Sequence, residues 1–271
     1  MKLGVGLVAY EMSDQYVESL SDSFNGIDLV YKVVVDNSPT DKKRFVFEKY
    51  NWTYIHFSNN PGFGFSHNKI FEKFGNLSEF HLVVNPDISF DPSCIIELVG
   101  FMKNNPSAGA VSPAIYYPDG GFQELRKLLP SPYGWFLRRF MRNSKQLNRY
   151  NELFELKMAP KNGVFKYPYM SGSFMLLRTE VIDKIGLFDD KIFMYGEDTD
   201  LSRRLWINGT EPYYYGKVSA IHVFAKGSHK SKRLLFIAIK STIYYFNKWG
   251  WIDRERVRIN NECLNQFRDD V

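Results

Sequence analysis

The sequence predicts an α/β fold, with a mostly parallel, Rossmann-like sheet flanked by helices. Through the first 116 residues, short runs rich in Val, Leu and Ile alternate with segments of helical character. Such alternation is typical of parallel sheets, whose strands are joined by crossover helices. Polar clusters follow three of the apolar runs, where open α/β sheets place their binding sites. These observations favour a site at one edge of the sheet.

The expected elements follow, in order, from apolar runs bounded by turn residues. In the first part of the chain we expect strands at residues 3–10, 31–35, 52–57, 80–84 and 110–115, separated by helices at residues 16–24, 42–50, 67–74 and 92–104. The apolar runs are short and nearly continuous, which is typical of strands buried on both faces of a sheet.

The pattern changes at residues 115–117. A basic and aromatic segment spans residues 130–150, and further elements are expected as strands at 171–177 and 213–223 and as helices at 181–186, 201–207 and 230–249. The last helix mixes Lys and Arg with large apolar residues, so aromatic and basic helices should end the chain. Such segments can lie on an anionic membrane surface, or they can pack internally and expose a solvated basic face.

Composition restricts the class of protein. A chain of 271 residues is enough for one large α/β domain or a domain with an appended lobe. The formal net charge of +5 is too small to imply nucleic-acid binding. Cys94 and Cys263 stand far apart, which argues against a disulfide scaffold or a zinc site and fits a reducing compartment. No secretory signal or long apolar stretch is visible, so we expect a cytoplasmic protein, soluble or peripheral.

Three carboxylates, Glu197, Asp198 and Asp200, fall within four positions just before the helix expected at residues 201–207. Acidic residues are favourable at a helix N-terminus, where they meet unpaired N–H groups. Alternatively, one of them is a general base at the mouth of a cleft. A second acidic element far upstream, around Asp87, favours the catalytic interpretation.

Asp87 stands just after an expected buried strand and is preceded by Pro86. One carboxylate together with a substrate diphosphate makes an ordinary Mg²⁺ or Mn²⁺ site, because hard cations take oxygen ligands and share them with phosphates. The alternative is an Asp that opens a turn before Ser89. His222, at the end of another expected strand, could ligate the same kind of cation as neutral imidazole, or it could be a structural hydrogen-bonding group.

Asp36 and Asn37 end the second expected strand, where a carboxylate can accept the imide N–H of uracil or thymine, or can simply form a turn. The Gly-containing segment 59–68 could bring its backbone close to a nucleotide. It matches neither a Walker loop nor a dinucleotide fingerprint, which counts against an ATPase and an NAD enzyme. No Gly-x-Ser-x-Gly motif is present, which argues against a hydrolase triad. Residues 9–14 lack the Gly-rich basic loop of a nucleotidyltransferase.

Taken in order, these motifs resemble the family 2 glycosyltransferases of the GT-A fold. The motifs that carry the resemblance are Val33-Val-Val-Asp-Asn-Ser38, Asn60-Pro-Gly-Phe-Gly64 with Asn68, Asn85-Pro-Asp87, Gly172-Ser-Phe-Met-Leu176, Gly186-Leu-Phe-Asp189 and Phe193-Met-Tyr-Gly-Glu-Asp-Thr-Asp-Leu201. Within the family the chain is most similar to bacterial rhamnosyltransferases of O-antigen and cell-wall assembly, through Phe193-Met-Tyr195, the Glu197-Asp198 pair and His222.

The resemblance implies a role for each motif. Asp198 would be the catalytic base, and Asp87 and His222 would hold Mg²⁺ or Mn²⁺. The implied nucleotide and donor site comprises Val8, Tyr10, Asp36, Asn37, Asn60, Gly62, Asn68, Asn85 and Asp87. The implied acceptor-binding or supporting residues are Glu197, Asp200, Gly172 and Arg126. Two departures stand out: Asn85 replaces the first Asp of the usual Asp-x-Asp motif, and Val8-Ala-Tyr-Glu11 replaces a Thr-Tyr-Asn-like strand end.

By the same resemblance, residues 1–229 form the glycosyltransferase domain, with the nucleotide-sugar side in 1–116 and the acceptor side in 117–229, and residues 230–271 form a C-terminal helical extension. The implied reaction is inverting transfer of L-rhamnose from dTDP-L-rhamnose to a polyprenyl-diphosphate-linked or oligosaccharide acceptor in bacterial surface polysaccharide synthesis. Transfer from a UDP-hexose and a non-catalytic sugar- or lipid-binding module are the alternatives. The chain could also dimerise through its aromatic C-terminal helix.

Overall fold

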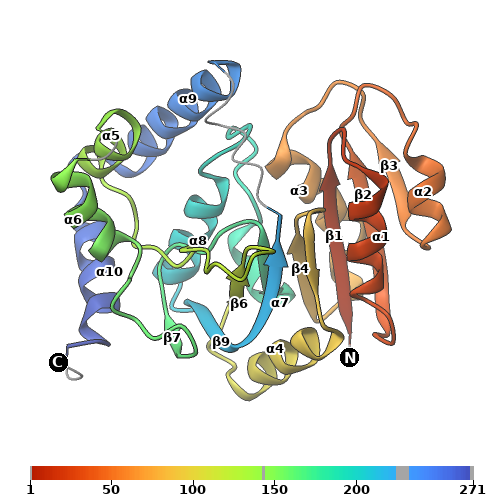
Figure 1. Ribbon diagram of the computed structural model, residues 1–271, viewed down its shortest axis with the longest axis horizontal. Helices are drawn as coiled ribbons and strands as arrows, with labels where there is room; N and C mark the ends of the chain where they lie inside the picture. The colour runs from red at the N-terminus through yellow and green to blue at the C-terminus, as the bar shows by residue number, and fades with distance from the viewer. Residues whose placement is uncertain (1, 142–143, 224–231, 269–271) are drawn as a thin grey trace.

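The computed structural model describes residues 2–141, 144–223 and 232–268. A single curled sheet runs through it, and helices cover the sheet on both faces (Figure 1). Its strands are β1 (Leu3–Ala9), β2 (Leu29–Asp36), β3 (Thr53–His56), β4 (Phe80–Val84), β5 (Ile88–Phe90), β6 (Ala110–Tyr116), β7 (Val164–Lys166), β8 (Phe174–Arg178) and β9 (Pro212–His222). Their order is β3-β2-β1-β4-β8-β6-β9-β5, and β7 pairs with β9 outside this path.

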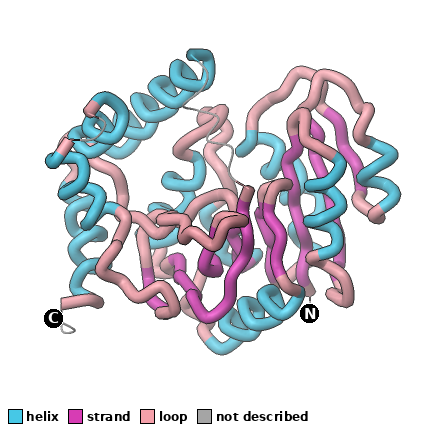
Figure 2. Tube along the Cα trace, viewed as in Figure 1, coloured by secondary structure: helices cyan, strands magenta, loops and turns pink. Residues whose placement is uncertain are grey.

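The helices, drawn in cyan in Figure 2, lie around the strands of this sheet, drawn in magenta. They are α1 (Asp14–Asp22), α2 (Arg44–Lys49), α3 (Phe63–Phe74), α4 (Pro92–Asn104), α5 (Pro132–Phe140), α6 (Lys145–Phe154), α7 (Thr179–Ile185), α8 (Glu197–Ile207), α9 (Lys232–Trp249) and α10 (Arg254–Asn265). Within the described ranges, none of these helices combines the length and the apolar character needed to span a bilayer.

The N-terminal half is the parallel sheet that the sequence predicts. β1 pairs in parallel with both β2 and β4, and β2 pairs in parallel with β3. All five side chains of β4 are buried, as expected for a central strand with helices on both faces. The α/β fold and its largely parallel sheet are confirmed.

The second half of the sheet is mixed. β8 runs antiparallel between β4 and β6, whereas β6 and β9 are parallel. Because β8 is reversed, its first residue, Phe174, pairs with the last residue of β4, Val84. β9 ends at His222, which pairs with Ile88 of β5. The reversal therefore brings the start of β8 and the end of β9 to the edge where β1, β2 and β4 end.

Several elements differ from the sequence-based expectation, and among them β7 was not predicted. The three-residue strand β5 was not predicted, because it is too short to show a pattern of its own. α3 begins at Phe63 rather than near His67. α8 begins at Glu197 rather than Leu201, so the acidic residues form its first turn. The acidic first turn of α8 carries no apolar periodicity, and the first turn of α3 contains Gly64 and follows Pro61 and Gly62, which are typical of a loop; both helix starts were therefore placed too late.

The core follows the two halves of the sheet, with one large apolar cluster around β1 and β4 and a second around β8 and α8. Ile259 and Cys263 of α10 are fully buried in the second cluster, so α10 packs against the second half of the sheet and α8. The expected domain boundary at residues 229 and 230 lies outside the described residues, as does His229. Arg142, in the basic segment at residues 130–150, also lies outside them.

Candidate active site

The candidate metal ligands meet at the edge of the sheet. Asp87 lies in the tight link between β4 and β5, and His222 is the last residue of β9. The Nε2 atom of His222 lies 3.3 Å from Oδ1 of Asp87. The backbone also joins them, since the N–H of Val223 donates to the carbonyl of Asp87 at 3.0 Å. Two residues 135 positions apart therefore form one pair, with His222 buried and Asp87 partly exposed, which fits a shared cation.

A side chain that the sequence did not single out, Gln123, orients this histidine. Its Nε2 donates to the carbonyl oxygen of His222 at 2.8 Å, and its Oε1 lies 3.0 Å from His222 Nδ1. Because the amide nitrogen is the donor in the first bond, the amide oxygen accepts in the second, and Nδ1 carries the proton. Nε2 is then the nitrogen that faces Asp87, and a second hydrogen-bonding partner of this kind is typical of metal-binding histidines.

The protein supplies few ligands at this point. Among residues 2–141, 144–223 and 232–268, no group of three or more His, Cys, Asp or Glu side chains is arranged to hold a metal. Asp87 and His222 provide one carboxylate oxygen and one imidazole nitrogen. Mg²⁺ and Mn²⁺ commonly complete such a set with waters and substrate phosphates. The donor set fits a cation that is bound together with a diphosphate.

Asp198 lies at the start of α8 and is held by backbone donors. Its Oδ2 accepts from the N–H of Gly172 at 3.0 Å, and its Oδ1 accepts from the N–H of Thr199 at 2.7 Å. Burial raises the pKa of Asp198, and the two N–H donors oppose that rise. A partly desolvated carboxylate in a fixed orientation is a suitable general base.

Glu197, beside it, has a different environment. Its side chain is buried, and its Oε2 atom finds no hydrogen-bond donor among the described residues. Burial, followed by the charge of Asp198, raises the pKa of Glu197 to about 8. When two neighbouring carboxyl groups have such different surroundings, one tends to stay protonated while the other ionises, because two negative charges at close range repel each other. At neutral pH the pair therefore carries its negative charge on Asp198.

The metal pair and the base are connected through two consecutive residues. Gly172 donates to Asp198, and the carbonyl of Ser173 accepts from the N–H of Asn85 at 2.9 Å. The loop before β8 therefore touches the Asn85-Pro-Asp87 link on one side and α8 on the other. The two acidic motifs that are distant in sequence are therefore held against the same loop.

A cavity of about 540 Å³ opens beside Asp198. It is enclosed by α5, α6, α9 and the first turn of α8, with Asp198 and Glu197 in its wall. Its other lining residues are mainly aromatic or basic: Lys127, Trp135, Arg138, Arg139, Tyr150, Phe154, Tyr169, Tyr195, Tyr245 and Phe246. This size is within the range of roughly 300–1,000 Å³ usual for small-molecule sites.

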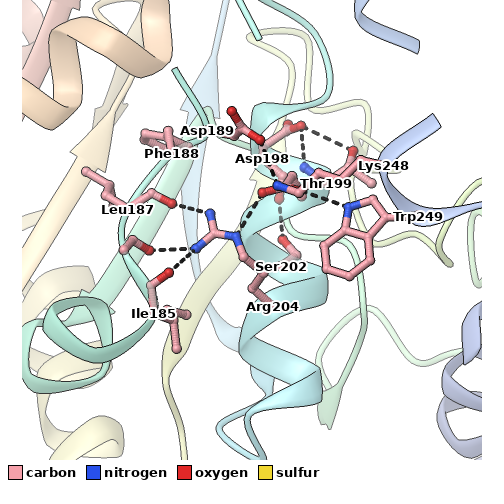
Figure 3. Close-up of polar contacts among 12 residues, drawn as sticks. Ile185, Leu187, Phe188, Asp189, Asp198, Thr199, Ser202, Arg204, Lys248 and Trp249 are labelled. Atoms are coloured by element: carbon pink, nitrogen blue, oxygen red, sulfur yellow. Dashed lines mark hydrogen bonds and ion pairs between the residues drawn. The ribbon is translucent and has the colours of Figure 1, made fainter. Parts of the chain in front are cut away.

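Asp200 is fully buried and joins α8 to the end of α9. Figure 3 labels its partners Arg204, Lys248 and Trp249. Its Oδ2 accepts from Nε of Arg204 at 2.8 Å, while its Oδ1 accepts from Nε1 of Trp249 at 2.8 Å and lies 2.7 Å from Nζ of Lys248. Lys248 also pairs with Asp189 at 2.7 Å. Asp200 therefore fixes the helix that covers the cavity, and its carboxylate has no free oxygen to offer a substrate.

Several residues assigned to the donor site hold loops together. Asn68 makes two bonds to the backbone of Phe188, and Asn37 donates to Ser66 at 2.9 Å. Gly62 has a positive φ of 107°, and a Cβ there would lie 2.6 Å from the carbonyl oxygen of Phe193. The contacts of Gly62 and Asn68 join residues 62–68 to the segment before α8, and the contact of Asn37 joins the end of β2 to α3. Asn68 and Asn37 therefore have hydrogen-bonding partners within the protein.

The remaining predicted residues are placed as follows. Asp36 is fully buried, and its carboxylate accepts from the hydroxyl of Tyr54 at 2.6 Å and from the N–H of Ser38 at 2.9 Å. Arg126 is buried outside the large cavity, where it donates to the carbonyls of residues 159 and 160 and pairs with Glu124. Val8, Tyr10 and Asn60 lie at or near the strand ends, with Tyr10 half exposed. A direct contact between these residues and a substrate remains a prediction.

Four residues that the sequence did not single out lie at the site or in the Asp200 network beside it: Gln123, Lys127, Arg139 and Lys248. Gln123 and Lys127 lie in an irregular stretch after β6, where no periodicity marks them. Arg139 and Lys248 belong to segments already described as basic, but only the fold shows which of their many cations face inward.

Comparison with known proteins agrees with this geometry. Residues 14–186 match the model of the family described as glycosyl transferase family 2. The chain is 26% identical, over 201 residues, to the N-acetylglucosaminyl-diphospho-decaprenol L-rhamnosyltransferase of Mycobacterium tuberculosis, covering 69% of this chain and 64% of that protein. It is 24% identical, over 248 residues, to rhamnosyltransferase WbbL of Escherichia coli K12, covering 86% and 88%. The chain thus spans about two thirds of the mycobacterial protein's length.

Solved structures show the same fold at low sequence identity. GalNAc-T7 with UDP, GalNAc and Mn²⁺ superposes with a TM-score of 0.63 and 13% identity, over 82% of this chain and 43% of that one. The mannosyltransferase PcManGT from Pyrobaculum calidifontis, in complex with GDP-Man and Mn²⁺, gives a TM-score of 0.58 and 14% identity, over 98% and 74%. The family match covers well over half of the chain. The chain belongs to glycosyl transferase family 2.

Proposed function

We propose that this protein transfers L-rhamnose from dTDP-L-rhamnose to a sugar hydroxyl on a polyprenyl-diphosphate carrier, with inversion, during bacterial surface polysaccharide synthesis. The observation that carries the proposal is that Gly172 and Ser173 link Asp198 to the Asn85-Pro-Asp87 segment, whose Asp87 lies 3.3 Å from His222. The choice of sugar is supported by the names of the two similar bacterial rhamnosyltransferases. The choice of carrier is supported by the decaprenyl-diphosphate named for the mycobacterial relative.

On the donor side, Asp87 and His222 would hold Mg²⁺ or Mn²⁺ together with the nucleotide diphosphate. A divalent cation bound there offsets negative charge on the departing diphosphate. Gln123 keeps His222 in the tautomer that leaves Nε2 toward Asp87. Because Asn85 is neutral, the protein contributes only one carboxylate from this motif. We therefore expect the cation and the nucleotide to bind together.

On the acceptor side, Asp198 removes the proton of the attacking hydroxyl as that oxygen bonds to the anomeric carbon. The bond to the diphosphate breaks on the opposite face, so a single displacement inverts the anomeric configuration. Gly172 and Thr199 hold the carboxylate in position through their N–H groups. Glu197 stays protonated at neutral pH, so a second negative charge does not disfavour the approaching oxygen.

Membrane association would complete this arrangement. α5 exposes Phe136 and Phe140, at 50% and 58% of their surface, on the helix that also lines the cavity. Exposed aromatic side chains beside cationic ones suit an anionic lipid surface. Flotation with vesicles containing phosphatidylglycerol tests this part of the proposal, and absence of the protein from the vesicle fraction at low salt would reject it.

A donor panel tests the proposed reaction. dTDP-rhamnose, UDP-glucose, UDP-N-acetylglucosamine and GDP-mannose are each supplied with Mg²⁺ or Mn²⁺ and a short-chain prenyl diphospho-N-acetylglucosamine. The expected result is a rhamnosylated product whose linkage, by NMR, is inverted relative to the donor. Turnover of a UDP-hexose instead would support the proposed mechanism but would show that rhamnose is not the donor sugar. Donor binding without transfer from any donor would favour a non-catalytic module.

A further inference from the structure

The large cavity is lined by cationic side chains that have no role in the proposed reaction. Three basic side chains, Lys127, Arg138 and Arg139, contribute to its lining. Arg138 is satisfied by the protein, since its Nη1 donates to Asn151 and to Glu155, each at 2.6 Å. Lys127 and Arg139 form no ion pair and no side-chain hydrogen bond with any residue that the structure describes. Two cationic side chains without an ion-pair partner among the described residues therefore line one cavity.

Lys127 is in an environment that disfavours its own charge. Burial, followed by the nearby charge of Arg138, lowers the pKa of Lys127 to about 8. Its Nζ lies 5.3 Å from the centre of the Tyr169 ring, a weak partner for an ammonium group. A desolvated ammonium beside a guanidinium is stabilised when an anion enters between them. The charges of Asp198, Glu155 and Glu124 oppose this lowering, but among the described residues none of these carboxylates forms an ion pair with Lys127.

The carboxylates of the cavity do not serve as that anion. Asp198 is engaged by the N–H groups of Gly172 and Thr199, and Glu197 is protonated at neutral pH because its pKa is raised to about 8. Asp198 lies close enough to Lys127 to affect its titration, but the two form no ion pair. The cations therefore lie near the base without being neutralised by it.

The donor diphosphate is not the natural partner either. Neither Asp87 nor His222 lines this cavity. The cations come from α5 and from the chain before it. α9, which lies near α5 in Figure 1, also lines the cavity. The anion expected here belongs to the molecule that presents its hydroxyl to Asp198.

We infer that Lys127 and Arg139 bind a phosphate of the acceptor, and that the acceptor is a glycosyl diphosphate whose first sugar carries the attacked hydroxyl. The argument rests on the proposed function, because it takes Asp198 as the base. One cavity of about 540 Å³ holds the base and both cations, so hydroxyl and phosphate must be close together in the acceptor. A long oligosaccharide would place its phosphate outside. Trp135 and Phe246 supply the apolar wall that a sugar face or the first prenyl unit needs.

Two acceptors that differ only in phosphate test the inference. One is decyl diphospho-N-acetylglucosamine, and the other is the neutral decyl N-acetylglucosaminide. Lys127→Met and Arg139→Gln remove charge while keeping most of each side chain. We expect each to raise KM for the diphosphate acceptor roughly 10- to 100-fold with kcat nearly unchanged, since a charge-assisted bond to phosphate is lost. KM for the neutral acceptor should change less than about twofold. Arg149→Gln, on the exposed side of α6, is the matched control.

Two results would overturn the inference. One is an equal loss with both acceptors. The other is a shifted pH profile of kcat/KM with both acceptors, because Lys127 would then act by tuning Asp198. Calorimetric titration of the diphosphate acceptor without donor separates this inference from the proposed function. If the wild type binds and the two variants do not, the anion subsite stands even when no donor supports transfer. If all three bind equally, the subsite is rejected whatever the catalytic outcome.

Discussion

The backbone N–H of Gly172 donates to Oδ2 of Asp198 at 3.0 Å, while the next residue, Ser173, accepts from the backbone of Asn85. One peptide segment thereby fixes the proposed base relative to the metal-binding link. The segment precedes β8, whose antiparallel insertion turns its first residues toward the carboxyl ends of β1, β2 and β4. The topology, rather than any single residue, brings the two acidic motifs to one place.

Replacing Asp198 with Asn should remove the general base and leave the shape of the site intact. We expect kcat to fall by roughly 10²- to 10⁴-fold, the usual contribution of a positioned base. Donor binding, followed by thermal shift with dTDP-rhamnose and Mn²⁺, should be nearly unchanged. Asp183→Asn, an exposed carboxylate on α7, is the control. Near-normal turnover in Asp198→Asn would remove this residue from its proposed role.

The bond from Gly172 predicts a change in pH dependence. Gly172→Pro deletes the N–H that stabilises the charged form of Asp198, so the carboxyl pKa should rise further. Because Asp198 must be ionised to accept a proton, the acid limb of kcat/KM should then move to higher pH. Gly172→Ala keeps the N–H, and its Cβ would lie 3.4 Å from Cβ of Asp198, an ordinary contact. Coinciding pH profiles for the Pro and Ala variants would show that the bond does not tune the base.

Gln123 should control metal affinity without touching the metal. Gln123→Ala removes the partner of His222 Nδ1, and such outer partners typically contribute 10- to 100-fold in affinity. We therefore expect the Mn²⁺ concentration for half-maximal activity to rise by about that factor, with kcat at saturating Mn²⁺ largely restored. His222→Ala should show a larger effect that excess metal does not rescue. An unchanged Mn²⁺ requirement in both variants would place the cation elsewhere.

The sequence was sufficient for much of this architecture and for part of the site. Val and Leu runs located β1, β2 and β4, because buried parallel strands are apolar on both faces. The Asp87–His222 contact was anticipated only through resemblance, since no local pattern relates residues on different strands. The mixed half of the sheet was not foreseen, because the direction of β8 depends on pairings distant in sequence. Only the coordinates show that the backbone of Phe188 and the side chain of Ser66 bond to Asn68 and Asn37, and a donor-binding role for these two residues stays a prediction.

The Asp200 network should govern stability more than chemistry. Asp200→Ala would leave Lys248 without one of its two carboxylates and Trp249 without its acceptor (Figure 3). Breaking a buried charged contact in this way usually costs about 3–5 kcal/mol. Lys248→Met should cost less, because Arg204 and Trp249 still bond to Asp200. Urea unfolding measures both, and equal midpoints for wild type and Asp200→Ala would contradict the tether between α8 and α9.

Two buried histidines should make the fold sensitive to acid. Burial holds the pKa of His67 well below its usual range and lowers that of His81 to about 3. The unfolded chain therefore binds more protons than the folded chain from about pH 6.5 downward, and stability falls as the pH falls. For His81 alone, going from pH 6.5 to pH 5 should cost about 2 kcal/mol.

The acid sensitivity can be traced to one side chain. His81 lies on β4, and its Nδ1 is 2.7 Å from the hydroxyl of Tyr31, so His81→Gln keeps a polar partner while removing the titratable ring. The variant should be less stable than wild type at pH 7.5, yet it should lose less stability between pH 7.5 and pH 5. His56→Gln, a partly exposed histidine on β3, should leave that pH slope unchanged. Parallel stability curves for wild type and His81→Gln would mean that the acid-sensitive group lies elsewhere, with His67 as the next residue to replace.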